Sequence, residues 1–394
     1  MDDTPTLSAG LAPAPKLTDL QKVVLPTGVP PGGICLRDAG RMHRRLTGEF
    51  GKCSHFHVMS RVAGGDMLFG DEEKEAFRLL MWRLAKFSGV EVLTYCVMGN
   101  HFHLLIRIPE REGFLARFVC DSPGGVGERR LLEHLKLLYS KAYLSRLESE
   151  IKELRRRGRE AEVQRVLDRY KGRFCDLSQF VKELKERFSR WFNRKHGRRG
   201  TFWMGRFRSV IVERGECLRT VAAYIDMNPV RAGLVAEPED YRWCGYTEAL
   251  GGSRLMRRGL CRAIGWPLGS WTKRGRRKSS GAEAYRCLLY GEGVEQLADA
   301  AGGKTVVKRR GLSVETAREV IEAGGKLGHY DLVRCRVRWF TEGAALGSEG
   351  FLRRVLGEIG GERNLRRMPV FERMGKKGVS GWFSLCRLRG RGVG

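Results

Sequence analysis

The sequence predicts an α+β protein in which helices pack on a small antiparallel sheet. Between His55 and Ile108, segments with the alternation of strands and a segment with helical spacing follow one another closely. A Gly99-Asn100 turn lies between two of the strand segments and pairs them as an antiparallel hairpin. Hydrophobic residues make up 42% of the 394 positions, enough to build a buried core. At about 100–200 residues per domain, the length predicts two or three domains.

Residues 1–48 precede these segments. They are rich in proline and have little periodic apolar pattern, which is typical of a segment that does not order on its own. We therefore predict a poorly ordered leader. The elements after it are predicted, in chain order, as a strand over 55–62, a helix over 72–87, a strand over 90–98 and a strand over 101–108.

A long charged segment over about 111–199 has apolar positions at three-and-four spacing and predicts a helical insertion. Within it, residues 149–171 carry mixed charges around a thin apolar stripe, as in a solvated helical hairpin or a short coiled coil. Solvated scaffolding is the favoured interpretation of such charged helices, and contact with nucleic acid is the alternative.

Two more elements complete the predicted sheet domain, which spans residues 49–250. They are a strand over 207–212 and a helix over 218–227, which ends at Asn228-Pro229 because proline does not continue a helix comfortably. Beyond residue 250 the composition shifts toward glycine, arginine and serine. Residues 251–394 are therefore predicted to form a separate, basic and mostly helical C-terminal region.

The charge balance indicates a polyanionic partner. Lys+Arg number 73 against 45 Asp+Glu, a formal net charge of +28, which attracts phosphates in a salt-dependent and sequence-independent way. The chain has no apolar run of about 18 residues and no secretory pattern, so we expect no membrane partner and a cytoplasmic, nucleoid-associated location. The 11 cysteines never form a Cys-x-x-Cys pair, which favours reduced, structural thiols.

His101 and His103 are the first candidate site residues. They lie two positions apart at the start of a predicted strand, so both project from one face while Phe102 projects from the other. Two imidazoles can hold a divalent ion when a third protein group joins them. The alternative is a hydrogen-bonded pair at a sheet edge. His55 and His57 have the same spacing on the first predicted strand, and periodicity does not say which pair holds a metal.

Tyr224 and Asn228 are the second candidate pair. They lie four positions apart and therefore on one face of the predicted helix. If that face lies over a histidine pair, Asn228 can be a third metal ligand and Tyr224 can aim its hydroxyl at a bound phosphate. The alternative, which spacing alone favours, is a core tyrosine and an ordinary asparagine at a helix end.

A basic segment with interleaved aromatics, near residues 194–208, predicts a groove for single-stranded nucleic acid. Its positive residues crowd around Trp203 and Phe207, which can act as stacking platforms for bases. In the alternative, these two aromatics belong to the core and only the basic residues meet DNA. The candidate DNA-binding residues are Arg194, Lys195, Arg198, Arg199, Trp203, Arg206 and Arg208.

Three motifs follow one another along the chain, at residues 95–106, at 200–207, and at 224–233 with the continuation 238–243. Together they closely resemble the IS200-like transposases of the HUH, single-tyrosine type, and more narrowly the REP-associated tyrosine transposases. The histidine motif of that family follows Met-x-Asn, which matches His101 and His103. In the matched pattern Tyr224 is the nucleophile and Asn228 the third metal ligand.

The resemblance implies a ferredoxin-like antiparallel sheet, with the histidine pair on a central strand and the tyrosine on a facing helix. It implies a metal-dependent transposase that nicks and rejoins single-stranded or hairpin DNA, as a monomer or homodimer. The expected cofactor is a divalent ion, Mg²⁺ or Mn²⁺, that polarises the scissile phosphate. Attack by Tyr224 would leave a 5′-phosphotyrosine and a 3′-OH. No general base for Tyr224 is evident in the sequence, and the C-terminal region is expected to assist DNA binding.

Two other functions are open at the level of sequence. The first is a catalytically silent or domesticated nucleic-acid-binding protein of the same fold. The presence of all four candidate site residues, His101, His103, Tyr224 and Asn228, argues against it. The second is an RNA-binding module that uses the sheet, although its strands lack the aromatic pattern of such modules.

Overall fold

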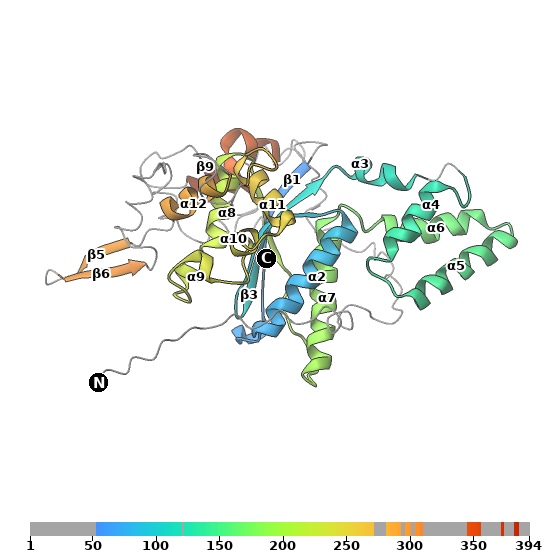
Figure 1. Ribbon diagram of the computed structural model, residues 1–394, viewed down its shortest axis with the longest axis horizontal. Helices are drawn as coiled ribbons and strands as arrows, with labels where there is room; N and C mark the ends of the chain where they lie inside the picture. Colours follow the sequence, from blue (N-terminus) through green and yellow to red (C-terminus); the bar gives the residue numbers. More distant parts are fainter. Residues whose placement is uncertain are drawn as a thin grey trace, which may run out of the picture.

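The computed structural model describes residues 53–119, 122–271, 281–292, 296–300, 304–309, 345–355, 372–373 and 382–385. The predicted leader over 1–48 lies outside the described residues, as does much of the chain after residue 292. Figure 1 shows an α+β architecture, as predicted, in which helices surround a central sheet.

The central sheet has seven described strands. In spatial order they are β2 (Glu91–Val97), β3 (His101–Pro109), β1 (Cys53–Arg61), β4 (Arg208–Val212), β7 (Ala345–Ser348), β9 (Trp382–Leu385) and β8 (Glu372–Arg373). Neighbours are antiparallel except β4 and β7, which makes the sheet mixed. A separate hairpin consists of β5 (Gln296–Ala300) and β6 (Lys304–Arg309).

The predicted strands and helices of the sheet domain are confirmed to within a few residues at their ends. β2 and β3 pair in antiparallel register on either side of the Gly99-Asn100 turn. The register places Arg61 of β1 opposite His101 of β3, and Met59 opposite His103. These pairings fix which side chains share a face of the sheet.

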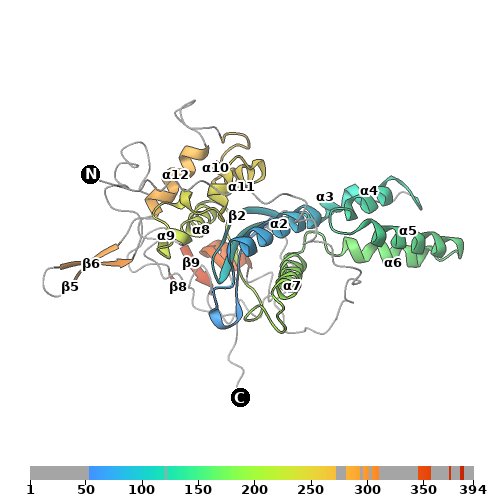
Figure 2. The same cartoon turned by 60° about the horizontal axis from the view of Figure 1, so that its bottom comes forward.

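One face of the sheet is covered by α2 (Asp71–Ser88) and α7 (Leu177–Lys195), which lie side by side in Figures 1 and 2. Acidic residues open α2, where they complement the helix dipole, and the Asp176 side chain caps α7 by accepting from the Gln179 amide at 2.9 Å. Phe102 of β3 meets Phe77 of α2 with ring centroids 4.8 Å apart. Phe77 in turn meets Phe188 of α7 at 5.3 Å, which closes this half of the core.

The opposite face is covered by helices from later in the chain. They are α8 (Glu216–Asp226), α9 (Asn228–Arg231), α10 (Gly245–Leu250), α11 (Arg254–Ile264) and α12 (Gly281–Glu292). Figure 2 shows this group on the other side of the sheet from α2 and α7. Met256, Leu260 and Tyr285 are fully buried in the same core as the strands. The described residues just beyond 250 therefore share one core with the sheet, and the predicted domain boundaries stay predictions.

The predicted helical insertion divides into two parts. Its first four helices, α3 (Arg111–Leu115), α4 (Val126–Leu135), α5 (Lys141–Arg156) and α6 (Glu160–Lys171), extend to one side of the sheet in both views. Its last helix, α7, is one of the two that cover the sheet. Three short 3₁₀ turns are also described: η1 (Ala63–Gly65), η2 (Ala116–Phe118) and η3 (Pro238–Asp240). Within the described residues, no helix has both the length and the apolar character to cross a membrane.

Candidate active site

His101 and His103 lie at the start of β3, as predicted, on the face opposite Phe102. Their ring centroids are 5.0 Å apart and their planes are nearly perpendicular. Phe102 instead packs into the core between α2 and Trp203. His103 is buried, with 2% of its surface exposed, and His101 is half-buried. The strand alternation therefore presents both imidazoles to the layer that contains α8.

Tyr224 lies on α8 and packs directly on this histidine pair. Its ring centroid is 5.8 Å from that of His103, with an edge-to-face angle of 88°. The residue is 5% exposed. The structure thus brings the predicted tyrosine, 121 positions further along the chain, to the face where His101 and His103 project.

A buried carboxylate on the same helix fixes α8 to the sheet. Thr94 of β2 donates its hydroxyl to both oxygens of Asp226, at 2.9 Å each, and the hydroxyl of Tyr285 on α12 donates to one of them. Burial raises the pKa of the Asp226 carboxyl to about 7, against the lowering effect of these hydrogen bonds. Sequence reasoning did not single out Asp226, because its strand and helix partners come from distant parts of the chain.

The competing pair, His55 and His57, lies on β1. Nε2 of His57 is 2.9 Å from Nδ1 of His103, and the two rings stack with centroids 5.1 Å apart and planes at 22°. The His57 ring also meets Tyr224, at 5.9 Å. His55 lies near Arg107 and Arg214, whose charges add to burial in lowering its pKa to about 4. One member of the second pair therefore joins the candidate site and the other does not.

Asn228 follows Tyr224 by one helical turn and is half-buried at the start of α9. Its amide nitrogen donates to the carbonyls of Tyr224, at 2.9 Å, and Ile225, at 3.3 Å. Both hydrogen bonds lie within its own helix end, as the alternative interpretation expects. They leave the amide oxygen as the atom that can accept a hydrogen bond or bind a cation.

Asn100, which sequence analysis used only as a turn signal, orients His101. Its amide nitrogen donates to the Gly65 carbonyl at 2.9 Å, so its amide oxygen faces Nδ1 of His101, at 2.6 Å. Because that oxygen can only accept, His101 carries its proton on Nδ1 and presents the lone pair of Nε2. The Met-x-Asn-His pattern places Asn100 next to His101 in the sequence. Spacing could not predict that Asn100 also binds the Gly65 carbonyl, which is distant in the chain.

Burial favours the neutral form of both candidate histidine ligands. Burial lowers the pKa of His103 well below its ordinary value, and the neighbouring His57, His101, Arg61 and Arg231 add to this effect. Burial also lowers the pKa of His101 to about 4, with a further contribution from Arg61. Neutral imidazoles are the form in which histidine binds metal ions.

The donors fit a hard divalent ion only as an incomplete set. In the described part of the chain, no three His, Cys, Asp or Glu side chains gather as a metal cluster. Two imidazole nitrogens and one amide oxygen would leave the remaining positions of an octahedral ion to water and phosphate oxygens. Such an open set suits a catalytic ion that must reach a phosphate, in contrast to a closed structural site.

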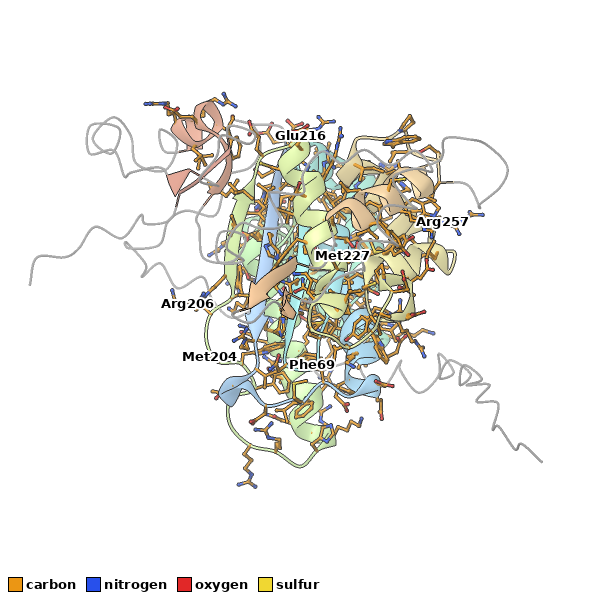
Figure 3. The ribbon with its side chains drawn as sticks, turned by 90° about the vertical axis from the view of Figure 1, so that its left-hand side faces the viewer. Phe69, Met204, Arg206, Glu216, Met227 and Arg257 are labelled. Atoms are coloured by element: carbon orange, nitrogen blue, oxygen red, sulfur yellow. The ribbon has the colours of Figure 1, made fainter. Side chains whose placement is uncertain are left out.

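The predicted basic segment lies at the end of the sheet where β3 begins. The Met204 amide donates to the Arg61 carbonyl at 3.0 Å, and Trp203 bridges to Val62, next to the residue that faces His101. Figure 3 shows Met204 and Arg206 at this edge of the molecule. Of the candidate DNA-binding residues, the exposed arginines are Arg194, Arg198, Arg199, Arg206 and Arg208.

Lys195 and Trp203 have other contacts. Lys195 forms ion pairs with Glu72 and Glu73 of α2, at 2.7 Å each. Trp203 is half-buried among Phe69, Phe102 and other rings, and its indole donates to the Lys185 carbonyl at 3.0 Å. Its placement is that of a core residue, the alternative weighed from the sequence. Contact of any of these residues with DNA stays a prediction.

Comparison with known proteins adds little to this geometry. No family model matches the chain, and no curated protein matches it. A solved structure of a REP-associated tyrosine transposase bound to a REP hairpin is similar over 58% of this chain and 92% of its own, at 13% identity and a TM-score of 0.31. A similarity at this level does not establish a common family, so the function has to be argued from the site itself.

Proposed function

We propose that this chain is a metal-dependent single-strand DNA endonuclease and strand transferase that acts on hairpin-forming DNA through a 5′-phosphotyrosine. The observation that carries the proposal is the packing of Tyr224 on His103, with ring centroids 5.8 Å apart, on the face of β3 that also presents His101. A phenol nucleophile beside two neutral imidazoles is the arrangement that the motif resemblance implies.

The topology supports the finer assignment of a ferredoxin-like fold of the HUH type. The spatial order β2-β3-β1-β4 is antiparallel throughout. One helix, α2, connects β1 to β2, and α7 is the helix that precedes β4. Among these four strands β3 and β1 lie in the middle, which agrees with the split βαβ pattern and supports the assignment of His103 to an inner strand.

The chemistry assigns a role to each site residue. His101, His103 and Asn228 would hold the divalent ion, which when bound supplies a positive charge that polarises the scissile phosphate. The Tyr224 oxygen gives up its proton to solvent and attacks phosphorus in line, forming the phosphotyrosine bond as the bond to the 3′ oxygen breaks. The leaving oxygen takes up a proton and becomes a 3′-OH.

Arg231 is placed to assist the nucleophile. Its guanidinium carbon lies 4.8 Å from the centroid of the Tyr224 ring. This contact puts a permanent positive charge beside the tyrosine that is proposed to attack. Because the phosphotyrosine retains the energy of the broken phosphodiester, the same 3′-OH can reverse the step and rejoin strands.

The proposal is tested with labelled hairpin oligonucleotides, including those that flank the gene, on denaturing gels. Wild-type protein with Mg²⁺ or Mn²⁺ should give a protein-linked 5′ end, which EDTA abolishes. Tyr224→Phe should lose the adduct and keep DNA binding, because only the nucleophilic oxygen is removed.

Tyr241→Phe is the matched control, because it removes a buried tyrosine hydroxyl that donates to the Val97 carbonyl and not to a histidine. An adduct that survives in Tyr224→Phe contradicts the assignment of the nucleophile. Binding without cleavage across the whole panel favours the alternative, a catalytically silent nucleic-acid-binding protein.

A further inference from the structure

We propose that His57 is a positioning residue for His103. Its role is to accept a hydrogen bond from Nδ1–H of His103, which holds that ring in one tautomer and leaves the Nε2 lone pair to bind a divalent cation. This inference rests on the proposed function for the identity of the site. It concerns a histidine on β1 that lies outside the matched motifs.

The geometry is that of a short, buried contact between two strands. His57 and His103 are each 2% exposed, and Nε2 of one lies 2.9 Å from Nδ1 of the other. The two residues are not directly opposite in the register, because His57 pairs with Leu105 and His103 with Met59. The rings therefore meet diagonally, stacked at 22°, and the contact fixes the angle of the His103 ring.

The direction of this hydrogen bond decides whether His103 can bind a cation. A neutral imidazole has one N–H and one lone pair. If His103 donates from Nδ1, its lone pair is on Nε2, on the other side of the ring. If His57 donates instead, a neutral His103 carries its proton on Nε2 and offers no lone pair there.

His101 shows the same arrangement with a different partner. The amide oxygen of Asn100 lies 2.6 Å from its Nδ1, and that oxygen can only accept. In each of the two candidate histidine ligands, one side chain thus holds Nδ1, and Nε2 lies on the opposite side of the ring. An outer partner at one ring nitrogen is the usual way in which proteins orient a metal-binding histidine, and losing it typically costs about 10- to 100-fold in metal affinity.

The first test is a titration of the full chain with Mn²⁺ in the absence of DNA. Electron paramagnetic resonance measures the bound Mn²⁺ at each step. His57→Leu should weaken Mn²⁺ binding about 10- to 100-fold. His57→Gln should recover much of the affinity, because its amide oxygen reaches the position of Nε2 and can accept from His103. The matched control is His55→Gln, which removes the other imidazole of β1 and should bind Mn²⁺ as the wild type does.

The second test observes the tautomer directly and needs no metal. Histidine-selective ¹⁵N labelling with long-range ¹H–¹⁵N correlation distinguishes a protonated from an unprotonated ring nitrogen, and His103→Gln assigns the signals. The wild type should show His103 protonated on Nδ1, and His57→Gln should retain this signature.

The outcomes separate the two proposals. A His103 protonated on Nε2, or a folded His57→Leu that binds Mn²⁺ as the wild type does, overturns the positioning role. A wild type with no Mn²⁺ affinity at all overturns the metal site of the proposed function, while the tautomer still decides whether His57 accepts from His103.

Discussion

Lys185 illustrates how burial of one residue shapes the surface beside the candidate site. It lies on α7 with 8% of its surface exposed, and its ammonium donates to the Gly205 carbonyl at 2.6 Å. The same nitrogen lies 5.2 Å from the centroid of the Trp203 ring. Burial lowers the pKa of Lys185 to about 8. The lysine thus ties the loop with Met204 and Arg206 to the helix layer.

This burial predicts a pH dependence of stability with a definite sign. The unfolded chain, with an ordinary lysine, binds more protons than the folded chain between pH 8 and about 10.5. The free energy of unfolding should therefore rise with pH across this window, by about 1–3 kcal/mol from this group. Urea unfolding at pH 7.5 and at pH 10 gives this rise in the free energy of unfolding for the wild type and for Lys185→Met. The difference between the two rises is the contribution of Lys185.

The control for Lys185→Met is Lys182→Met, one turn earlier on α7, whose side chain is 57% exposed. Lys182→Met should keep the wild-type rise with pH, whereas Lys185→Met should flatten it. Identical pH dependence in all three proteins would contradict the account of Lys185 as a buried cation.

At the residue scale, the sequence predicted which residues share a face but not what their side chains contact. Strand alternation predicted the shared face of His101 and His103, and the motif resemblance chose them over His55 and His57. The hydrogen bond between His57 and His103 was not predictable, because the two residues are 46 positions apart and meet only through the register of their strands. The sequence does not decide whether Trp203 is a stacking platform or a core residue, because the charges around it do not indicate which side chains pack against its ring.

At the scale of elements, α11 shows how closely a helix approaches the sheet. A Cβ added to Gly259 would lie 2.7 Å from the Leu93 carbonyl oxygen and 2.8 Å from that of Val92. Both are backbone atoms of β2, which cannot move without disturbing its pairing with β3. Glycine is therefore required for this helix to lie directly on the strand.

Gly259→Ala should destabilise the protein by about 1–3 kcal/mol, because the methyl group overpacks the contact between α11 and β2. The matched control is Gly113→Ala in α3, where an added Cβ meets nothing within 4 Å. That change should be neutral or stabilise by up to about 1 kcal/mol through helix propensity. Thermal unfolding measures both, and an equal effect of the two substitutions would contradict the close approach of α11.

The elements of the sheet domain were largely predictable, and their partners were not. Alternation and helical spacing located β1, α2, β2 and β3 to within a few residues of their observed ends. The packing of α11 on β2 was not predicted, because the two elements are distant from each other in the chain. The boundary predicted at residue 250 rests on composition and stays a prediction, although described residues on both sides of it lie in one core.

At the scale of the whole molecule, positive charge and the candidate site occupy the same end. The sheet end where β3 begins carries Arg61, and the segment with Arg206 runs beside it. Lys195 and His196 at the end of α7 pair with Glu73 at the start of α2, which brings Arg198 and Arg199 toward that same end. With a net charge of +28, the chain should bind single-stranded DNA with strong salt dependence.

Replacing Arg198, Arg199 and Arg206 together by Gln should lower the slope of log K against log salt by about 2, at about 0.7 for each phosphate contact on a single strand. The matched control replaces three exposed arginines of the protruding helices, Arg146, Arg165 and Arg169, and has the same change in net charge. Fluorescence anisotropy over a salt series measures the slopes. Equal losses in both triple variants would indicate that net charge, and not this end of the molecule, governs binding.

The central claim is that Tyr224 is the nucleophile, and the most direct measurement is the site of covalent attachment. Wild-type protein is incubated with a cleaved hairpin oligonucleotide and Mn²⁺, digested with nuclease and trypsin, and analysed by mass spectrometry. The tryptic peptide over residues 220–231 contains Tyr224 as its one tyrosine and ends at Arg231. This peptide should carry the nucleotide 5′-phosphate on Tyr224, whereas a nucleotide on any other residue would contradict the account.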